Sequence, residues 1–208
     1  MRGTLIVFEG GEGSGKTYGV RHAKKILKKQ GKKVMITHEP GGTKIADKIR
    51  DIILYEDGEK VHERTELFLF LASRAQHMEE KILPALKRGQ IVLCDRFSGS
   101  TIAYQVYARK VADLKFIKKM DEFVRFGVDP DMVLYLDVDP KIGLARRIKD
   151  KKQTLTRIDK EKLEFHKKVR SGFLKLLKSE KNWYKIDSNK PIEEVYNNID
   201  EIISTKNR

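Results

Sequence analysis

Short apolar segments alternate with amphipathic segments along most of the chain. Five of them have the length and the continuous apolar character of strands buried on both faces of a parallel sheet. They cover residues 4–9, 34–37, 91–94, 132–137 and 183–187. The pattern predicts an α/β fold, in which a parallel five-stranded sheet carries helices on both faces.

Helical periodicity fills the segments between these strands. Gly31 and Gly127 are placed as C-terminal caps, and Pro84 is expected to kink or end the helix that contains it. The polar stretch Lys149–Thr156 interrupts a long helical region. The predicted helices cover 16–30, a segment around 45–53, 65–88, 100–108, 113–126, the two parts of 140–180, and a last helix that Pro191 starts.

Length and composition indicate one domain. The 208 residues contain no internal repeat and no linker, so residues 1–208 are expected to form a single unit. No run of about 18 apolar residues is present, and the N-terminus enters a strand at once, so neither a membrane span nor a signal peptide is expected. The single Cys94 fits a small core residue in a reducing compartment, which predicts a cytoplasmic protein.

The chain carries a formal net charge of +14, which favours anionic ligands. Much of this charge belongs to lysines at helix-surface positions, for example Lys24, Lys25, Lys28 and Lys29. A solvated helix face explains such lysines, and no basic patch interleaved with aromatic residues is present. Nucleotides are therefore expected as ligands, and nucleic acid is not.

A glycine-rich motif directly follows the first predicted strand. It has the form G-x-x-x-x-G-K-T, and a strand, a glycine loop and a helix in that order form a phosphate cradle. Its glycines turn backbone N–H groups toward an anion, and the helix adds the positive end of its dipole. The residues of this cradle are Gly10, Gly11, Glu12, Gly13, Ser14, Gly15, Lys16 and Thr17.

Charged or glycine-rich residues follow three other strands. They are Glu39–Thr43, Asp95-Arg96 and Asp137–Asp139, and in a parallel sheet they meet at the carboxyl edge where ligands bind. The chain lacks the D-x-x-G and N-K-x-D motifs of switch GTPases. A P-loop NTPase fold of the small-kinase type is therefore predicted, with a lid that keeps water from the γ-phosphate.

A second anion needs its own positive charge, and Arg74 and Arg96 are the candidates. Arg74 lies in an apolar helix, where it either serves an acceptor site or pairs with a helix neighbour. Phe70 shares its face and either frames a nucleobase or packs in the core. The polar segment 98–105 either reads a pyrimidine and its ribose or forms a capped surface helix.

Several short motifs along the chain resemble those of one enzyme family. The chain is similar to bacterial thymidylate kinases, nucleoside monophosphate kinases that convert dTMP to dTDP with ATP. Three of these motifs identify the family more specifically than the phosphate loop alone, namely E-P-G-G-T, D-R-F and A-Y-Q. The matching stretches lie at 8–17, 39–43, 66–76, 95–97, 100–105, 135–140 and 164–170.

The resemblance implies a pocket for the acceptor nucleotide. Phe70 would stack on thymine, and Arg74 and Gln105 would hydrogen-bond the base. Tyr104 would lie against the sugar and disfavour a 2′-hydroxyl, while Glu12 would point to the acceptor sugar hydroxyl. The other substrate-binding residues that the resemblance implies are Glu39, Pro40, Ser100 and Thr101.

The resemblance also implies how the phosphates are held. Arg96 would clamp the phosphate of dTMP, and Asp95 would organise phosphates and Mg²⁺. The phosphate-loop motif itself already predicts that Lys16 reaches the β- and γ-phosphates of ATP and acts in catalysis, and that the Thr17 hydroxyl joins the coordination of Mg²⁺.

Some family members carry a catalytic arginine in the phosphate loop, where this chain has Gly13. This chain resembles the members whose catalytic arginines lie in the lid, here at about 146–158. Arg146, Arg147 and Arg157 are the candidates, with helix-surface cations as the alternative for the first two. The family's common D-R-x-E reads Thr156-Arg157-Ile158-Asp159 here, so which arginine acts stays open.

The sequence thus predicts an ATP- and Mg²⁺-dependent dTMP kinase that acts in dTTP biosynthesis. The resemblance implies a homodimer formed through helices, and the apolar excess of 65–83 is compatible with that. One alternative is a kinase for another nucleoside or nucleoside monophosphate. The other is a basic, nucleotide-dependent protein that binds nucleic acid.

Overall fold

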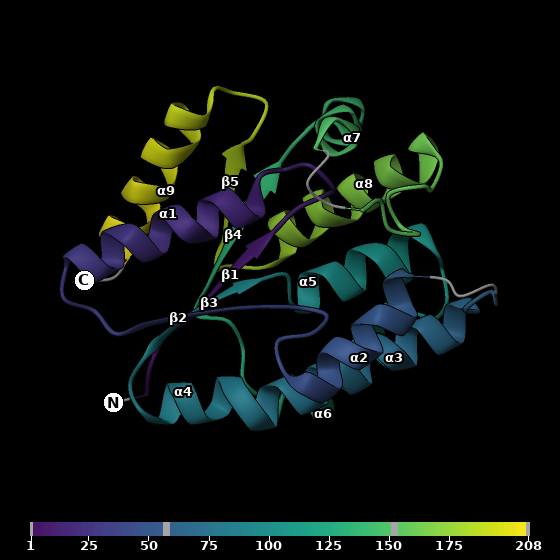
Figure 1. The fold of residues 1–208 in the computed structure, drawn as a ribbon, viewed down its shortest axis with the longest axis horizontal. Coiled ribbons are helices and arrows are strands. Elements are labelled where there is room, and N and C mark those ends of the chain that lie inside the picture. The colour runs from purple at the N-terminus through teal and green to yellow at the C-terminus, as the bar shows by residue number, and fades with distance from the viewer. Residues whose placement is uncertain (1, 56–58, 151–153, 207–208) are drawn as a thin grey trace.

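One parallel sheet of five strands organises the molecule (Figure 1). The computed structural model describes residues 2–55, 59–150 and 154–206. The strands are β1 (Leu5–Glu9), β2 (Val34–His38), β3 (Ile91–Asp95), β4 (Met132–Asp137) and β5 (Trp183–Asp187). All pairings are parallel, in the order β2-β3-β1-β4-β5. The predicted α/β fold and its five strands are confirmed.

The burial of each strand follows from its place in the sheet. Strands β1 and β4 lie inside the sheet and are buried at every position. The edge strands β2 and β5 are each buried at a single position. A strand covered on both faces favours apolar side chains, which is why β1 and β4 are continuous apolar runs up to the carboxylate at the end of each.

The helices form a layer on each face of the sheet (Figure 1). Helices α1 and α9 bury Val20, Leu27, Val195 and Ile199 against one face. The helical segments from α2 to α6, together with α8, lie on the opposite side, and α7 packs against the loop that follows β1. No helix among the described residues is long and apolar enough to cross a membrane. The bounds are α1 (Lys16–Lys29), α2 (Lys44–Leu54), α3 (Glu63–His77), α4 (Leu83–Lys87), α5 (Ser98–Thr101), α6 (Leu114–Val124), α7 (Pro140–Lys149), α8 (Leu163–Ser179) and α9 (Ile192–Lys206).

The long helix predicted over 65–88 is not regular. Helix α3 passes into a π-helical segment, η1 (Met78–Ile82), before α4 begins. The backbone N–H of Leu83 bonds the carbonyl of Met78, five residues earlier. Pro84 has no N–H and crowds the carbonyl four residues before it, so the ordinary ladder ends ahead of the proline.

A second π-helical segment, η2 (Ile102–Ala108), follows the short helix α5. It was predicted only as part of a helix over 100–108, and it carries Tyr104 and Gln105. The break inside 140–180 is longer than predicted, since α7 ends at Lys149 and α8 begins at Leu163. Part of the predicted lid, residues 151–153, lies outside the described residues.

Asp137 ties three elements together at the carboxyl end of β4. Arg170 of α8 donates from Nε to Oδ1 of Asp137 at 2.7 Å and from Nη2 to Oδ2 at 3.0 Å. Lys185 of β5 lies 3.0 Å from Oδ2, and the Tyr135 hydroxyl donates to Oδ1 at 2.9 Å. Burial alone would raise the pKa of Asp137, but these donors lower it to about 2.

Asp137→Asn is therefore expected to destabilise the protein at neutral pH by at most about 2 kcal/mol. A depressed carboxyl pKa contributes stability above the unfolded value of 3.8, and that stability is lost as pH falls toward 2. The difference in unfolding free energy between wild type and variant should shrink from pH 7 to pH 3 in urea titrations. The exposed Asp51 offers the control Asp51→Asn. An equal difference at both pH values would contradict the role of the ionised carboxylate.

Candidate active site

The loop between β1 and α1 surrounds the ammonium group of Lys16. Its Nζ donates to the carbonyl oxygens of Gly10 and Gly11 at 3.1 and 2.8 Å. A third bond reaches Oγ of Ser14 at 3.2 Å. Burial lowers the pKa of Lys16 to about 8. A buried cation in a loop of backbone N–H groups favours an anionic ligand, which is what a phosphate supplies.

Gly13 lies where helix α7 packs against the phosphate loop. Its φ is +65°, and a Cβ added there would lie 2.0 Å from the carbonyl oxygen of Gly143. The two backbones can approach this closely only without side chains. An arginine at position 13 would not fit this arrangement, so an arginine near this loop must come from another element.

Thr17 and Asp95 form a pair of hard oxygen ligands beside the loop. The Thr17 hydroxyl, on the first turn of α1, donates to Oδ2 of Asp95 at 3.0 Å. Two adjacent ligands of an octahedral Mg²⁺ at its usual bond length are also about 3 Å apart. The donor set and its spacing therefore fit the Mg²⁺ that the sequence predicted here.

A cavity of about 150 Å³ opens beside the loop at the carboxyl edge of the sheet. It brings together all ten residues that were predicted to bind the substrate. Phe70 and Arg74 lie one turn apart on α3 and both line it, as their shared face predicted. The ten residues are Glu12, Glu39, Pro40, Phe70, Arg74, Arg96, Ser100, Thr101, Tyr104 and Gln105.

Glu12 turns out of the phosphate loop toward this cavity. Its Oε1 accepts from Nη2 of Arg96 at 2.8 Å and from the Tyr104 hydroxyl at 2.7 Å. Burial would raise the pKa of Glu12, but the charges of Arg96 and Lys16 hold it at about 2. The carboxylate thus stays ionised and is paired with Arg96 and Tyr104 in the acceptor cavity. Arg96 also donates from Nη1 to Oγ of Ser100 at 3.2 Å.

Glu9, which the sequence analysis did not select, holds the segment that carries Arg96. Arg96 has a φ of +71°, an uncommon value for a side chain of this size. Oε1 of Glu9 accepts from the backbone N–H groups of Phe97 and Ser100, both at 2.9 Å. The Ser100 hydroxyl donates to Oε2 at 2.6 Å. Three hydrogen bonds to one buried carboxyl group keep the strained turn in place. Burial raises the pKa of Glu9 to about 7.

Arg74 lies at the floor of the cavity, with its charge balanced by two carboxylates. Nε donates to Oε2 of Glu39 at 2.7 Å, and Nη1 donates to Oδ1 of Asp121 at 2.5 Å. Nη1 also reaches Oγ1 of Thr101 at 3.0 Å, and the guanidinium stacks 5.0 Å over the ring of Phe97. Burial would lower the pKa of Arg74, but the two carboxylates raise it. The alternative of an ion pair with a helix neighbour is wrong, because both partners lie on other elements.

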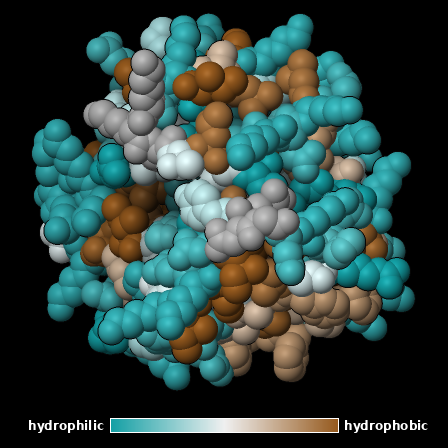
Figure 2. All heavy atoms as spheres, turned by 45° about the vertical axis from the view of Figure 1, so that its right-hand side comes forward, coloured by the Kyte–Doolittle hydropathy of each residue, from teal (hydrophilic) through white to brown (hydrophobic). Residues whose placement is uncertain are grey.

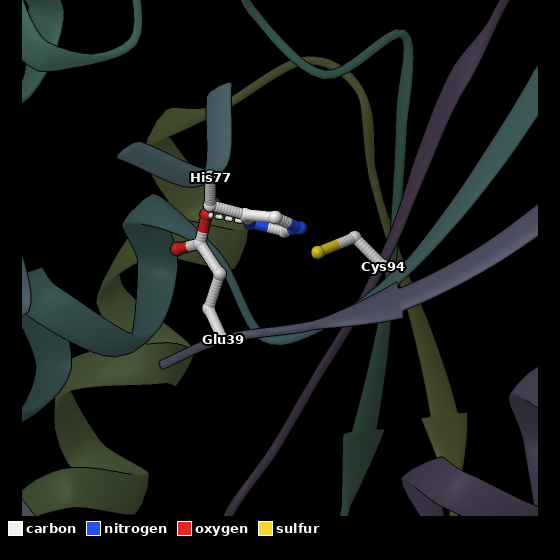
Figure 3. A group of neighbouring side chains, drawn as sticks. All are labelled: Glu39, His77 and Cys94. Atoms are coloured by element: carbon white, nitrogen blue, oxygen red, sulfur yellow. Dashed lines mark hydrogen bonds and ion pairs between the residues drawn. The ribbon is translucent and has the colours of Figure 1, made fainter. Parts of the chain in front are cut away.

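Glu39, His77 and Cys94 form a buried group whose ligand atoms lie within 4.8 Å of one another (Figure 3). Both ring nitrogens of His77 are engaged, Nδ1 with Oε1 of Glu39 at 3.0 Å and Nε2 with Oγ1 of Thr37 at 2.6 Å. The thiol of Cys94 donates to the carbonyl of Arg96 at 3.1 Å, and burial raises its pKa. A protonated thiol and a satisfied imidazole do not suit a metal. The group instead orients Glu39 toward Arg74, and Cys94 is a core residue as predicted.

The three lid arginines have different surroundings. Arg147 lines the acceptor cavity and is held by Asp159, from Nε to Oδ1 at 3.1 Å, and by the carbonyl of Thr154 at 2.7 Å. Its Nη1 is buried and has no hydrogen-bond partner among the described residues. Arg146 is exposed and donates to the carbonyl of Ser188 at 2.8 Å, outside the cavity lining.

Arg157 belongs to a different cluster. It donates from Nη2 to Oε2 of Glu66 on α3 and from Nε to the carbonyl of Ile53 at 3.3 Å. Neither the acceptor cavity nor the phosphate-loop cavity includes it in its lining. The structure therefore brings only Arg147 of the three next to the other predicted site residues.

A second cavity, of about 500 Å³, follows the phosphate loop from Glu12 to Arg21. Five residues line both this cavity and the acceptor cavity, namely Glu12, Glu39, Arg50, Arg96 and Arg147. Arg50 was missed by the sequence analysis; its Nη1 donates to the carbonyl of Pro40 at 2.8 Å. Three arginines at the junction of two cavities concentrate positive charge where two anions would meet.

Comparisons with known proteins agree with this geometry. The family model described as thymidylate kinase matches residues 8–199. A thymidylate kinase from Clostridium novyi (strain NT) is 43% identical over 199 residues, which cover 95% of this chain and 97% of that protein. One from Geobacillus sp. (strain WCH70) is 43% identical over 94% of this chain and 93% of its own length. One from Bacillus pumilus (strain SAFR-032) is 40% identical over 98% of this chain and 96% of its own length.

Proposed function

The chain belongs to the thymidylate kinase family, and we propose that it transfers the γ-phosphoryl group of ATP to dTMP, giving dTDP for dTTP synthesis. The observation that carries this proposal is the junction of the two cavities, whose shared wall holds three arginines and two carboxylates. One cavity follows the phosphate loop and suits a triphosphate. The other carries every residue that was predicted to hold a nucleoside monophosphate.

The acceptor nucleotide lies with its base over the floor of the acceptor cavity. Phe70 offers a ring for stacking, and Arg74 and Gln105 offer polar groups to the edge of the base. The phosphate of dTMP points to the shared wall, where Arg96 and Arg50 bind it. Tyr104 lies beside the sugar and is held there by its bond to Glu12.

The donor nucleotide binds along the phosphate loop, with Lys16 bonding the β- and γ-phosphates. Thr17 and Asp95 would hold Mg²⁺, which would neutralise phosphate charge. ATP and Mg²⁺ are thus the cofactors that the donor set of this loop supports.

The transfer needs little acid–base chemistry from the protein. The attacking oxygen of dTMP is already anionic, so no general base has to be found. The residues of the shared wall hold the two phosphates in line and balance the charge that spreads over the γ-phosphoryl oxygens. Arg147 and Lys16 stabilise that charge, while the lid excludes water and so directs the transfer to the nucleotide.

We also propose a cytoplasmic homodimer. Helices α3 and α6 pack together and leave large apolar side chains exposed, among them Phe68 at 52% and Phe123 at 78%. Figure 2 shows apolar side chains gathered on the lower part of the face that it presents. Burying such a surface against a second copy would stabilise the pair. Analytical ultracentrifugation of the wild type against Phe123→Asp tests this assembly.

A panel of phosphate acceptors tests the function directly. With ATP and Mg²⁺, dTMP should be used with a kcat/KM at least about tenfold above that of dUMP, dCMP, AMP and thymidine. The panel separates a dTMP kinase from a kinase for another nucleoside or nucleotide. Equal use of two or more of these acceptors would contradict the dTMP assignment. Tight, salt-sensitive DNA binding without phosphoryl transfer would favour the nucleic-acid alternative.

A further inference from the structure

The carboxamide of Gln105 has one engaged end and one end without a partner. Its Nε2 donates to Oε1 of Glu66 at 2.7 Å. Its Oε1 is buried and has no hydrogen-bond partner among the residues that the structure describes. Gln105 is 0% exposed and lines the acceptor cavity. A buried acceptor without a partner is costly, so a ligand that donates to it gains affinity.

Glu66 decides which end of this amide is engaged. An ionised carboxylate accepts hydrogen bonds and cannot donate one. It therefore binds the amino group of Gln105 and leaves the carbonyl oxygen for the cavity. The other orientation would place two acceptors against each other inside the protein, where repulsion is weakly screened.

Two arginines hold the carboxylate of Glu66 in position. Arg157, from the end of the lid, donates to Oε2, and Arg109 of the segment after η2 donates from Nε to Oε1 at 3.3 Å. Glu66 itself is 1% exposed. Arg109 is fixed in turn by Glu161, 2.6 Å from its Nη1, and by the ring of Phe165, whose centroid is 4.6 Å from the guanidinium. The two guanidinium groups balance the charge of this buried carboxylate and fix its orientation.

We infer, on the premise that the chain is the proposed dTMP kinase, that Glu66 is a specificity-determining positioning residue that selects pyrimidines with an N3–H. Thymine presents a donor at N3, which meets the acceptor that Glu66 leaves exposed on Gln105. Cytosine presents an acceptor at N3 and would face Oε1 with no proton between the two atoms. Glu66 touches no substrate and acts through Gln105.

Replacing Glu66 with glutamine is expected to invert this arrangement. The carbonyl oxygen of the introduced side chain would face Arg157, its closest cationic neighbour. The introduced amino group would take the place of Oε1, where it faces Gln105 and displaces the longer contact of Arg109 at 3.3 Å. The amide of Gln105 would then accept from that amino group and turn its own amino group toward the base. That surface suits the N3 acceptor of cytosine and repels the N3–H of thymine.

The experiment compares dTMP with 5-methyl-dCMP, which has the same shape but exchanges donor and acceptor at N3 and at position 4 of the base. We expect the wild type to favour dTMP by at least about 10³-fold in kcat/KM. Glu66→Gln should reduce that ratio at least tenfold, with the KM for ATP changed less than twofold. The exposed Glu63, one turn earlier on α3, supplies the control Glu63→Gln, which should keep the wild-type ratio.

The pair exchange Glu66→Gln with Gln105→Glu keeps the net charge and tests the same idea in a second way. The amide introduced on α3 would donate to the carboxylate introduced on η2. The other oxygen of that carboxylate would again offer an acceptor to the base, so the preference for dTMP should return. A folded Glu66→Gln variant with the wild-type ratio, or an exchanged pair that favours 5-methyl-dCMP, would overturn the role of Glu66. If the wild type phosphorylates neither nucleotide, the proposed function fails instead.

Discussion

Arg147→Ala is expected to lower kcat for dTMP by about 10³-fold and to change the KM of either substrate less than about threefold. Arg147 borders both cavities, and its Nη1 is buried without a partner among the described residues. Asp159 and the carbonyl of Thr154 hold the rest of the guanidinium, so the free nitrogen is positioned in advance. Such a group gains its partner when charge develops on the transferring phosphoryl group, which affects kcat more than binding.

The other two lid arginines provide the comparison. Arg146→Ala should leave kcat within about threefold, because this side chain is exposed and bonds the carbonyl of Ser188. Arg157→Ala should act mainly on stability and on the KM for dTMP, since it removes a partner of the buried Glu66. Steady-state kinetics of the three variants, with an unfolding curve for each, separate these effects. A kcat for Arg147→Ala within tenfold of wild type, or a larger loss at Arg146, would contradict the assignment.

The sheet could be predicted from the sequence because strands that are buried on both faces form short, continuous apolar segments. Every position of β1 and β4 is buried, and all but the last residue of each strand are apolar. These strands were therefore predicted to within one residue. The helices were harder. The π-helical turns of η1 and η2 differ from an α-helix in which backbone N–H each carbonyl accepts from. Apolar periodicity does not predict that difference. Pro84 indicated where the regular α-helical hydrogen bonding would end, but it did not predict that a π-helical segment would precede it.

A local motif was enough to predict the glycine loop between β1 and α1, because its eight residues from Gly10 to Thr17 are neighbours along the chain. Residues that act through tertiary pairing were missed. Glu9 gave one usable signal, a carboxylate at the end of an otherwise apolar strand, where burial requires a partner. Asp121 and Glu66 gave none, because each lies in an ordinary helix and meets its partners only after folding.

The charged residues also show that the sequence predicts local features but not tertiary partners. Lys25, Lys28 and Lys29 are exposed on α1, as a solvated helix face predicts. Arg74 had to find a partner, and the sequence suggested either a ligand or a helix neighbour. Its partners are Glu39 and Asp121, which are 35 and 47 residues away along the chain. Periodicity along one helix cannot reveal contacts at that separation.

Arg74→Met is expected to lower the free energy of unfolding by about 3–5 kcal/mol and to raise the KM for dTMP at least tenfold. The variant leaves Glu39 and Asp121 buried, at 5% and 4% exposure, without the guanidinium between them. It also removes a polar group from the floor of the acceptor cavity. The KM for ATP should change less than twofold, because Arg74 does not line the phosphate-loop cavity. Urea unfolding and initial rates measure the two effects.

A double variant separates the structural role of Arg74 from its role in binding. In Arg74→Met, Asp121 keeps one cationic partner, Arg125, whose Nε donates to Oδ2 at 3.1 Å. Asp121→Asn removes the excess negative charge, so Arg74→Met with Asp121→Asn should recover part of the lost stability. Glu39 keeps His77 as a partner in both variants. If Arg74 also bonds the base, the KM for dTMP stays high in the double variant although the protein is more stable. If Arg74 only neutralises the two carboxylates, stability and KM return together toward the wild-type values, and the binding role is wrong.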